Sequence, residues 1–390
     1  MDFHLDTLLN LPDIVADSYS STLDTIVIKL RLVNDGINCP NCNEYIHKLH
    51  QTRPILVRDL SIFGQVVYLK VPRRQFYCTN CKTSPTESLS WLNKKQRQTN
   101  RYQEYIYERV SVAGEPPRKE LTVKQVSENE KMSEDAIQDI FHKVASSKKN
   151  WGYPKRLSLD EFARRKGQGK FATILTDLDK SSLLEVIDSH KSDDIIAVLK
   201  QQPLAMREGV EEVCVDMWGG FPKVIREVFP NAKIVVDRFH VQKLVNKAVN
   251  KIRLKLSLKG LKNRWLLMNN KTNLTNEEKE ELEPILTSSP SLRIAHELKE
   301  ELIAIYNSDI TSCGGMRAMK KWLISARVMF GSAADTLDSH LAEICNYFNN
   351  RTTSGVTEGI NTRIKLIIRQ SYGFKNFDLM KEKLLACLFK

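Results

Sequence analysis

The pattern of apolar and polar positions predicts a β-rich segment at the start of the chain, followed by a helical one. Within residues 1–90, β-branched and aromatic residues gather in short runs between turn-forming residues, a pattern typical of strands. Residues 94–150 instead carry apolar residues at helical spacing. The clearest strand-like runs are Thr25–Val33 and Gln65–Val71, and the predicted helices are Tyr102–Val112, Val123–Glu130 and Glu134–Val144.

From residue 155 the pattern changes to that of a mixed sheet. Three apolar runs joined by short turns precede helical and strand-like runs in alternation. The order β-β-β-α-β-α-β predicts an antiparallel meander that continues into parallel strands joined by helical crossovers. The strands are expected at Arg156–Phe162, Phe171–Leu178, Leu183–Ser189, Glu212–Met217 and Lys233–Arg238, and the helices at Asp193–Gln201 and Pro222–Phe229.

These changes of pattern predict a multidomain α+β protein, because 390 residues are too many for one ordinary core. We expect a β-rich finger domain over residues 1–93 and a helical domain over residues 94–150. An α/β domain is expected over residues 155–240 and 346–390. Residues 241–345 lack strand-like runs and are predicted to form an all-helical insertion within it.

The charge balance indicates a polyanionic partner. Lysine and arginine number 59 against 47 acidic residues, which gives a net charge of +12 and a pI near 9.2. Such an excess most often accompanies nucleic-acid binding, although charge alone does not separate DNA from RNA or an anionic membrane. No apolar run reaches the ~20 residues of a membrane helix, and the acidic N-terminus lacks the basic region of a secretory signal. We therefore expect a cytoplasmic protein with reduced cysteines.

Four of the eight cysteines form two Cys-x2-Cys knuckles, Cys39-Pro-Asn-Cys42 and Cys78-Thr-Asn-Cys81. Each knuckle places two thiolates at a tight turn, so the pair completes a tetrahedral sulphur site for a structural Zn²⁺. Two alternatives remain open: the first knuckle with His47 and His50 as ligands, and reduced thiols without metal. A redox role is disfavoured because no thioredoxin-like pattern surrounds either knuckle.

The helices Val123–Glu130 and Glu134–Val144, with Ser133 as N-cap of the second, have the dimensions of a helix-turn-helix. In that motif the second helix enters the major groove of DNA, but many unrelated helix pairs share the pattern. Ordinary surface positions are therefore the alternative for each candidate contact. The candidate DNA contacts are Gln138, His142 and Lys143 on the second helix, and Arg73 and Arg74 before the second knuckle.

Three acids lie where two-metal phosphoryl chemistry needs rigidly held carboxylates, for which Mg²⁺ or Mn²⁺ is the suitable metal. Asp160 lies inside an apolar strand, where a lone acid is costly unless it is paired or metal-bound. Asp216 ends another apolar strand, at the end where open α/β sheets bind ligands. Glu358 opens a predicted helix. The neighbouring acids that compete for these roles are Glu161, Asp177, Asp179 and Glu343.

Glu358 begins a polar stripe, because Asn361, Lys365 and Arg369 follow it on the same helix face. A carboxylate followed by cations on one face suits a metal ion with DNA phosphates beside it. Asp237 and His240 follow the last predicted strand and are expected near the same site. Their alternative role is to cap the junction between that strand and the next helix.

A basic helix is predicted directly after this junction, because every charged residue between Gln242 and Arg264 is a lysine or an arginine. Neutralisation of several phosphates by such a helix gives steeply salt-dependent DNA binding. A solvated face is the alternative. Trp265 is a candidate for stacking on an extruded base or for core packing. The lysines proposed to contact DNA are Lys243, Lys247, Lys251 and Lys255.

Taken in order, these motifs resemble the bacterial insertion-sequence transposases of the ISL3 family, which are of the DDE type. The resemblance covers essentially the whole chain, and its last block is the most specific. One departure lies after the second knuckle, where TSPTE lacks the aromatic residue expected there; it affects only the packing of the finger. The motifs that carry the resemblance are CPNC, RRQFYC, CTNC, LSLDEFARRKG, VCVDMWGGF, VVDRFHV and SGVTEGINTRIKLIIRQSYGF.

The resemblance implies an RNase H-like catalytic domain interrupted by the helical insertion. It implies that Asp160, Asp216 and Glu358 are the catalytic acids, and that Asp237 and His240 form the DxxH element of related transposases. The implied activity is binding of terminal inverted repeats, metal-dependent release of a 3′-OH and transfer of that end into target DNA. A homodimer or larger assembly in the bacterial nucleoid is implied as well.

Three other functions compete with this interpretation. The first is a sequence-specific DNA-binding regulator, derived from a transposase, that has lost catalysis. The second is an RNase H-like nuclease that cuts RNA or branched DNA without strand transfer. The third is a basic nucleoid-type structural protein, which would not distinguish inverted-repeat DNA from a random duplex.

Overall fold

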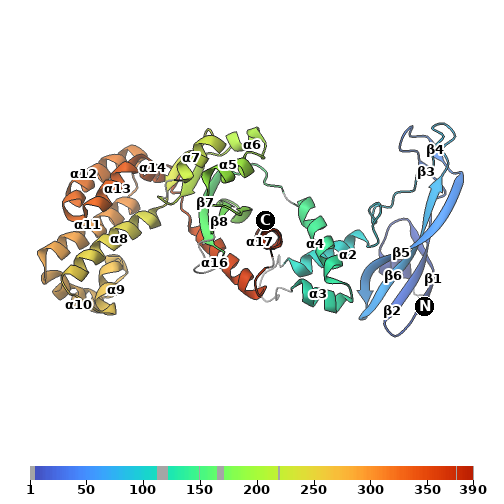
Figure 1. Cartoon of the computed structure of the whole chain (residues 1–390), viewed down its shortest axis with the longest axis horizontal. Helices are drawn as coiled ribbons and strands as arrows, with labels where there is room; N and C mark the ends of the chain where they lie inside the picture. The colour runs from blue at the N-terminus through green and yellow to red at the C-terminus, as the bar shows by residue number, and fades with distance from the viewer. Residues whose placement is uncertain are drawn as a thin grey trace. The chain divides into compact units, whose positions relative to one another are not determined.

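The computed structural model describes residues 5–111, 122–148, 150–164, 171–217, 220–374 and 376–389. The chain divides into two compact units, residues 1–149 and residues 150–390 (Figure 1). The predicted finger and helix pair fall in the first unit, and the predicted α/β domain and helical insertion fall in the second. Among the described helices, none combines the length and apolar character needed to cross a membrane.

The first unit is built on a four-stranded sheet with the strand order β1-β2-β6-β5. Alternation along β2 buries Ile28, Leu30 and Leu32 and leaves Lys29 and Arg31 exposed, which gives the sheet one core face. The strands are β1 (Ile14–Ser21), β2 (Thr25–Leu32), β5 (Leu49–Ile62) and β6 (Gln65–Phe76); the short elements around them are α1 (Leu5–Leu9), β3 (Ile37–Asn38) and β4 (Tyr45–Ile46).

Strands β5 and β6 form a long antiparallel ribbon that sequence reasoning predicted only in part. The strand expected to end at Val71 continues to Phe76, because β5 pairs with it along its whole length, from Ile62↔Gln65 to Leu49↔Phe76. Strand β5 escaped prediction because its first half is polar and contains Pro54. Both features are tolerated there, since β5 is one of the two edge strands of the sheet.

Three helices complete the first unit, and their boundaries agree closely with the sequence prediction. The side chains of Thr99 and Thr122 cap the first two helices, and the Ser133 hydroxyl accepts the backbone N–H of Ala136 at the start of the third (3.2 Å). Lys131 adopts the left-handed conformation (φ 52°) that ends the second helix. The helices are α2 (Asn100–Val110), α3 (Val123–Glu130) and α4 (Glu134–Lys148).

Buried charges join the ribbon to these helices. Arg58 of β5 lies 3.4 Å from the Glu130 carboxylate at the end of α3, and both side chains are almost fully buried. Tyr102 donates its hydroxyl to the same carboxylate (3.0 Å). The Thr99 hydroxyl donates to buried Asp59 of β5 (2.7 Å). Removal of one partner from such a network leaves an uncompensated buried charge, so the sheet and the helices form one structural unit.

The second unit contains a five-stranded sheet with the order β11-β10-β7-β8-β9. β7, β8 and β9 form an antiparallel meander, and β10 and β11 continue it as parallel strands. The predicted element order is confirmed, with one additional short helix, α6 (Leu204–Glu208). The strands are β7 (Arg156–Ala163), β8 (Phe171–Asp177), β9 (Ser182–Ile187), β10 (Glu212–Val215) and β11 (Lys233–Val236).

Helices cover both faces of this sheet. Leu157 and Leu159 of β7 pack with α5 (Ser192–Leu199) and α7 (Phe221–Val228) on one face. Phe162 of β7 packs with α16 (Gly355–Gln370) and α17 (Phe377–Leu388) on the other. The two faces therefore separate odd from even positions of β7, as strand alternation requires. Asp160 belongs to the face covered by α16.

The described residues between β11 and α16 form helices joined by turns and contain no strand. Val245 and Val249 of α8 share a core with Val235 and Val236 of β11, which anchors this helical segment to the edge of the sheet. Trp322 is buried in that core. The helices are α8 (Arg238–Lys255), α9 (Leu261–Met268), η1 (Lys271–Asn273), α10 (Asn276–Thr287), α11 (Pro290–Asn307), α12 (Ser312–Phe330), α13 (Ser332–Ser339), α14 (Leu341–Cys345) and α15 (Tyr347–Asn350).

Candidate functional sites

The two cysteine knuckles converge on one point. The sulphur atoms of Cys39, Cys42, Cys78 and Cys81 all lie within 4.8 Å of one another. The first knuckle lies in the β3–β4 hairpin and the second directly follows β6, so the long ribbon sets their distance. His47 and His50 are exposed and lie outside the cluster. The geometry therefore favours the four-cysteine set over the alternative with two histidines.

The cluster has the geometry and chemistry that Zn²⁺ requires. With Zn–S bonds of about 2.3 Å, the sulphur atoms of a tetrahedral site lie about 3.8 Å apart. The Cys42 and Cys78 sulphur atoms are 3.6 Å apart. Hydrogen bonds from the backbone N–H groups of Asn41 and Cys42 lower the pKa of the Cys39 thiol to about 7. Four protein ligands leave no position for substrate, so the site is structural.

Strand register brings two of the predicted acids to the same level. β7 and β10 are parallel, and Cys214 pairs with Ser158, so Asp216 follows β10 level with Asp160. Level residues on parallel strands point to the same face, which here is the face covered by α16. The Asp160 carboxylate accepts hydrogen bonds from the backbone N–H of Glu161 (2.8 Å) and the side-chain amide of Asn361 (2.7 Å).

The electrostatics of this region are those of clustered acids. Burial raises the pKa of Asp160, and the nearby negative charge of Asp216 raises it further. The hydrogen bonds from Glu161 and Asn361 and the charge of His240 oppose this shift. The pKa of Glu161 is raised by burial and by the charges of Asp216 and Asp160. A cation bound beside Asp160 and Asp216 would offset the repulsion between their two negative charges.

Helix α16 brings the third acid toward the sheet. Asn361 of α16 donates to Asp160, and Ser354, the residue before α16, donates its hydroxyl to Asp237 at the end of β11. Glu358 lies one turn before Asn361 on the same helix face and is exposed. Among the described residues, the four cysteines are the one group close enough for shared metal ligation, so Asp160, Asp216 and Glu358 do not form such a group.

Asp237 and His240 occupy different environments. Asp237 is buried and caps α8, where its carboxylate accepts the backbone N–H of Phe239 (3.4 Å) and the Ser354 hydroxyl. This is the capping role that the sequence left as the alternative. His240 is half-buried in the first turn of α8, and its charge acts on Asp160.

The acids named as alternatives have structural partners. Asp177 accepts the backbone N–H groups of Asp179 (2.9 Å) and Lys180 (3.1 Å) in the turn between β8 and β9. Asp179 forms an ion pair with Arg156. Glu343 lies 3.9 Å from Arg226. These contacts account for three of the four alternatives, and only Glu161 shares the electrostatic environment of Asp160.

The structure separates the adjacent residues Arg73 and Arg74. Arg74 forms two hydrogen bonds with the buried Glu87 carboxylate (2.8 Å each) and two with Asn34 (2.8 Å each). Its guanidinium therefore has a structural role in the fold, and its DNA contact stays a prediction. Arg73 lies on the opposite face of β6 and has no carboxylate partner among the described residues.

The other predicted DNA contacts lie on exposed helix faces. On α4, Gln138 is half-buried and His142 is exposed; Lys143 is exposed and donates to Gln103 (3.3 Å). On α8, Val241, Val245 and Val249 are buried while the four lysines are exposed. Lys365 and Arg369 are exposed on α16, whereas Asn361 is half-buried against Asp160. Trp265 is 49% exposed on α9.

Sequence reasoning missed the residues that hold these elements together. Ser354 and Glu212 are the clearest examples: buried Glu212 of β10 accepts hydrogen bonds from Asn350 (2.9 Å) and Thr352. These contacts fix the segment that leads into α16. Their partners lie far apart in the sequence, so no spacing rule predicts them. The sequence signal for these contacts was weak: a threonine and a serine, Thr352 and Ser354, shortly before the predicted helix.

Comparison with known proteins gives matches over nearly the whole chain. The profile of the zinc finger of transposases IS204/IS1001/IS1096/IS1165 matches residues 35–81. The helix-turn-helix profile of transposase family ISL3 matches residues 87–145, and an ISL3 profile described as a transposase matches residues 157–384. The chain is 24% identical over 380 residues to the transposase for insertion sequence element IS1001 of Bordetella parapertussis, covering 93% of this chain and 91% of that protein.

Proposed function

Because the chain belongs to the ISL3 family of transposases, we propose that it cuts the ends of an insertion sequence and joins them to target DNA. One observation carries this proposal. Asp160 and Asp216 lie level on neighbouring parallel strands, and Asn361 ties the helix that bears Glu358 to Asp160. Three acids held by a sheet and a returning helix suit phosphoryl transfer.

The proposed catalytic domain is RNase H-like, with residues 155–240 and 346–390 as its two parts and residues 241–345 as an insertion. The antiparallel meander followed by two parallel strands supports this assignment. The shared core of β11 and α8 supports an insertion that is anchored to the sheet. The finger over residues 1–93 and the helix-turn-helix over residues 94–150 would act as the DNA-binding part.

Asp160, Asp216 and Glu358 would hold Mg²⁺ or Mn²⁺, since hard carboxylate oxygens suit both ions. When bound, these ions polarise the attacking and leaving oxygens of a phosphodiester. Asn361 orients Asp160 through its amide, and His240 faces the scissile phosphate region. Asp237 fixes the starts of both α8 and α16, so we assign it a positioning role.

Two reactions follow at this one site. In the first, water attacks phosphorus at the element boundary and the P–O3′ bond breaks, which releases a 3′-OH on the element. In the second, that 3′-OH attacks a target phosphodiester, and the target P–O3′ bond breaks as the new bond forms. The number of phosphodiester bonds is conserved in the second reaction, so no external energy source and no covalent protein–DNA intermediate are needed.

The DNA partners are the terminal inverted repeats and the target duplex. Gln138, His142 and Lys143 of α4 would contact the repeats, and the lysines of α8 with Lys365 and Arg369 would neutralise phosphates near the active site. Two ends must be joined together, so a homodimer or larger assembly on DNA is part of the proposal. The proposed location is the bacterial cytoplasm, in association with the nucleoid.

A strand-transfer assay tests the proposal. The wild-type chain is given a pre-cleaved terminal-repeat duplex with a free 3′-OH, a supercoiled target plasmid and Mg²⁺. Joined products that are absent with Asp160→Ala are expected. A nuclease would degrade DNA without joining it, and a regulator would bind the repeat without cutting or joining. Either of those results with an active protein preparation would refute the proposal.

A further inference from the structure

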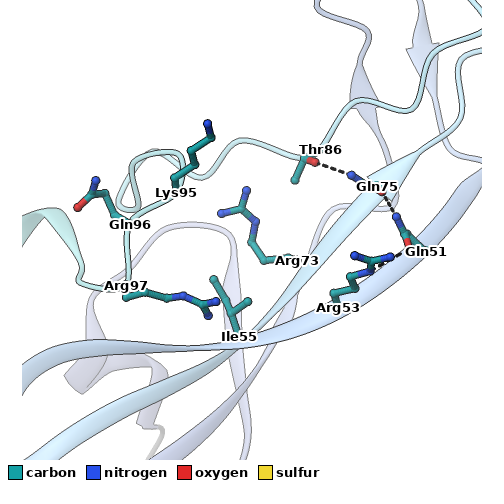
Figure 2. A pocket seen from close by; sticks show the side chains of 9 residues that line it. All are labelled: Gln51, Arg53, Ile55, Arg73, Gln75, Thr86, Lys95, Gln96 and Arg97. Atoms are coloured by element: carbon teal, nitrogen blue, oxygen red, sulfur yellow. Dashed lines mark hydrogen bonds between the residues drawn. The ribbon is translucent and has the colours of Figure 1, made fainter.

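A cleft of about 380 Å³ lies beside the β5–β6 ribbon in the first unit (Figure 2). Four of the residues that line it are cations, and none is acidic or aromatic. Arg53 and Arg73 come from the two strands of the ribbon. Lys95 and Arg97 come from the segment that connects the sheet to α2. The proposed catalytic and helix-turn-helix functions do not involve these four side chains as a group.

Strand register brings the two ribbon arginines together. Arg53 and Arg73 are direct cross-strand partners, as are Gln51 and Gln75, so all four side chains lie on one face. A line of hydrogen bonds holds this face. Arg53 donates to Gln51 (3.1 Å), Gln51 bonds Gln75, and Gln75 donates to Thr86 (3.0 Å). Figure 2 shows this line along one side of the cleft.

Backbone hydrogen bonds hold the other wall of the cleft, which is the segment between the sheet and α2. The N–H of Arg58 donates to the carbonyl of Arg97 (2.7 Å), and the N–H of Thr99 donates to the carbonyl of Arg58 (3.0 Å). The connecting segment is thereby attached to the edge of β5, next to the buried Arg58–Glu130 pair. One wall of the cleft is the paired ribbon and the other is a turn segment bonded to β5 at Arg58, so the ribbon fixes Arg53 and Arg73 most firmly.

None of the four cations forms an ion pair with a carboxylate in the described part of the chain. The neighbouring arginines of the same sheet behave differently, since Arg58 pairs with Glu130 and Arg74 with Glu87. Like charges gathered around one cleft repel one another, and an anion seated between them removes that repulsion. The arrangement therefore has the properties of an anion site.

We propose that this cleft grips the sugar–phosphate backbone of duplex DNA. Arginine forks bind phosphate oxygens in a bidentate manner, and the glutamine amides beside them add neutral donors. The cleft lacks the aromatic platform on which proteins stack the bases of single strands, so it contacts backbone alone. The inference rests on the proposed function and adds to it a second, sequence-independent grip beside the helix-turn-helix.

The test uses the full-length chain and a short fluorescein-labelled duplex of random sequence. Binding is measured by fluorescence anisotropy over about 50–200 mM salt. The cleft variant is Arg53→Gln with Arg73→Gln. Its matched control is Lys29→Gln with Lys70→Gln, because these exposed lysines are also cross-strand neighbours but lie on the opposite face of the sheet. Zinc content and the melting temperature report whether each variant is folded.

We expect the cleft variant to reduce the slope of log affinity against log salt by about 1–2 and to weaken binding about 10-fold or more at 0.1 M salt. The control is expected to keep the wild-type slope. Because lysine keeps the positive charge, the slope of Arg73→Lys should lie closer to the wild-type value than that of Arg73→Gln. A folded cleft variant with an unchanged slope would overturn the proposal, as would an equal loss in the control. The proposal would also be overturned if the cleft variant lost binding of single-stranded DNA but kept duplex binding. It would be overturned as well if the variant lost only the binding of inorganic phosphate.

The outcome also separates this inference from the proposed function. If the cleft variant binds like the wild type and strand transfer proceeds, only the cleft assignment fails. If the wild-type chain binds no duplex and joins no ends, the proposed function fails together with the inference that rests on it.

Discussion

The cysteine cluster and the acid site differ in how the chain assembles them. The cysteines lie in two short knuckles at one end of a single ribbon, and their sulphur atoms converge within 4.8 Å. The acids lie on β7, after β10 and on α16, and they depend on strand register and on a helix that returns after the long helical segment. The closed structural site thus depends on local spacing, whereas the proposed catalytic site depends on topology.

The acid site gives the largest predicted effect. Asp160→Asn keeps the shape of the side chain but removes the charge on which metal binding depends. We expect DNA cleavage to fall by about 10³-fold or more, the scale seen when one member of a catalytic set is lost, with unchanged affinity for the terminal repeat. Glu161→Gln is the neighbouring control and should keep most of the activity. Equal losses in both variants would mean that the acid has been misassigned.

Loss of one cysteine should weaken DNA binding and leave the second unit, residues 150–390, folded. Cys78→Ser removes one of four zinc ligands, so we expect loss of bound zinc by atomic absorption and loss of specific end binding by about 10³-fold, the usual margin over non-specific DNA. Cys313→Ser changes an exposed cysteine of the other unit and should alter neither. Specific binding that survives in zinc-free Cys78→Ser protein would show that the cluster is dispensable for recognition.

The basic face of α8 should contribute through charge alone. Replacement of Lys247, Lys251 and Lys255 by glutamine is expected to weaken DNA binding about 100-fold at 0.1 M salt and to flatten its salt dependence. Lys200 and Lys223 are the controls, because each already forms an ion pair, with Glu227 (3.2 Å) and Asp193 (2.7 Å). If the salt dependence of DNA binding is unaltered in the triple variant, the lysines of α8 form an ordinary solvated surface.

The smallest effect is expected from the residue that links the two parts of the acid site. Asn361→Ala removes the amide that orients Asp160, and loss of such a supporting group typically costs on the order of 10-fold in activity or metal affinity. Thr362→Ala is the matched control, since its hydroxyl bonds a carbonyl of its own helix (3.1 Å). The readout is the Mg²⁺ concentration at half-maximal cleavage. A normal value in Asn361→Ala would break the proposed link between α16 and β7.

Sequence reasoning was most successful where the information is local. Short apolar runs predicted the strands of the second unit in order, and capping residues such as Ser133 placed the helices within a few residues. The two knuckles predicted the four-cysteine cluster, and the structure favours it over the alternative with His47 and His50. Strand β5 was missed because an edge strand tolerates polar residues and Pro54, which weakens the pattern.

Contacts between distant residues could not be predicted in this way. Arg73 and Arg74 look equivalent in the sequence, yet strand alternation turns one into a cleft and the other onto Glu87. Asp237 looked like a site residue, and its buried carboxylate caps α8 and holds Ser354. The role of each of these residues depends on a partner that is distant in the sequence and close only in the folded chain.

The central claim is that α16 supplies the third acid of one site with Asp160 and Asp216. The most direct test compares cleavage of a terminal-repeat duplex in Mg²⁺ by the wild type, Glu358→Gln and Glu343→Gln. The account predicts a nick at the element boundary with the wild type and Glu343→Gln, and none with Glu358→Gln. Cleavage that persists in Glu358→Gln and disappears in Glu343→Gln would contradict it.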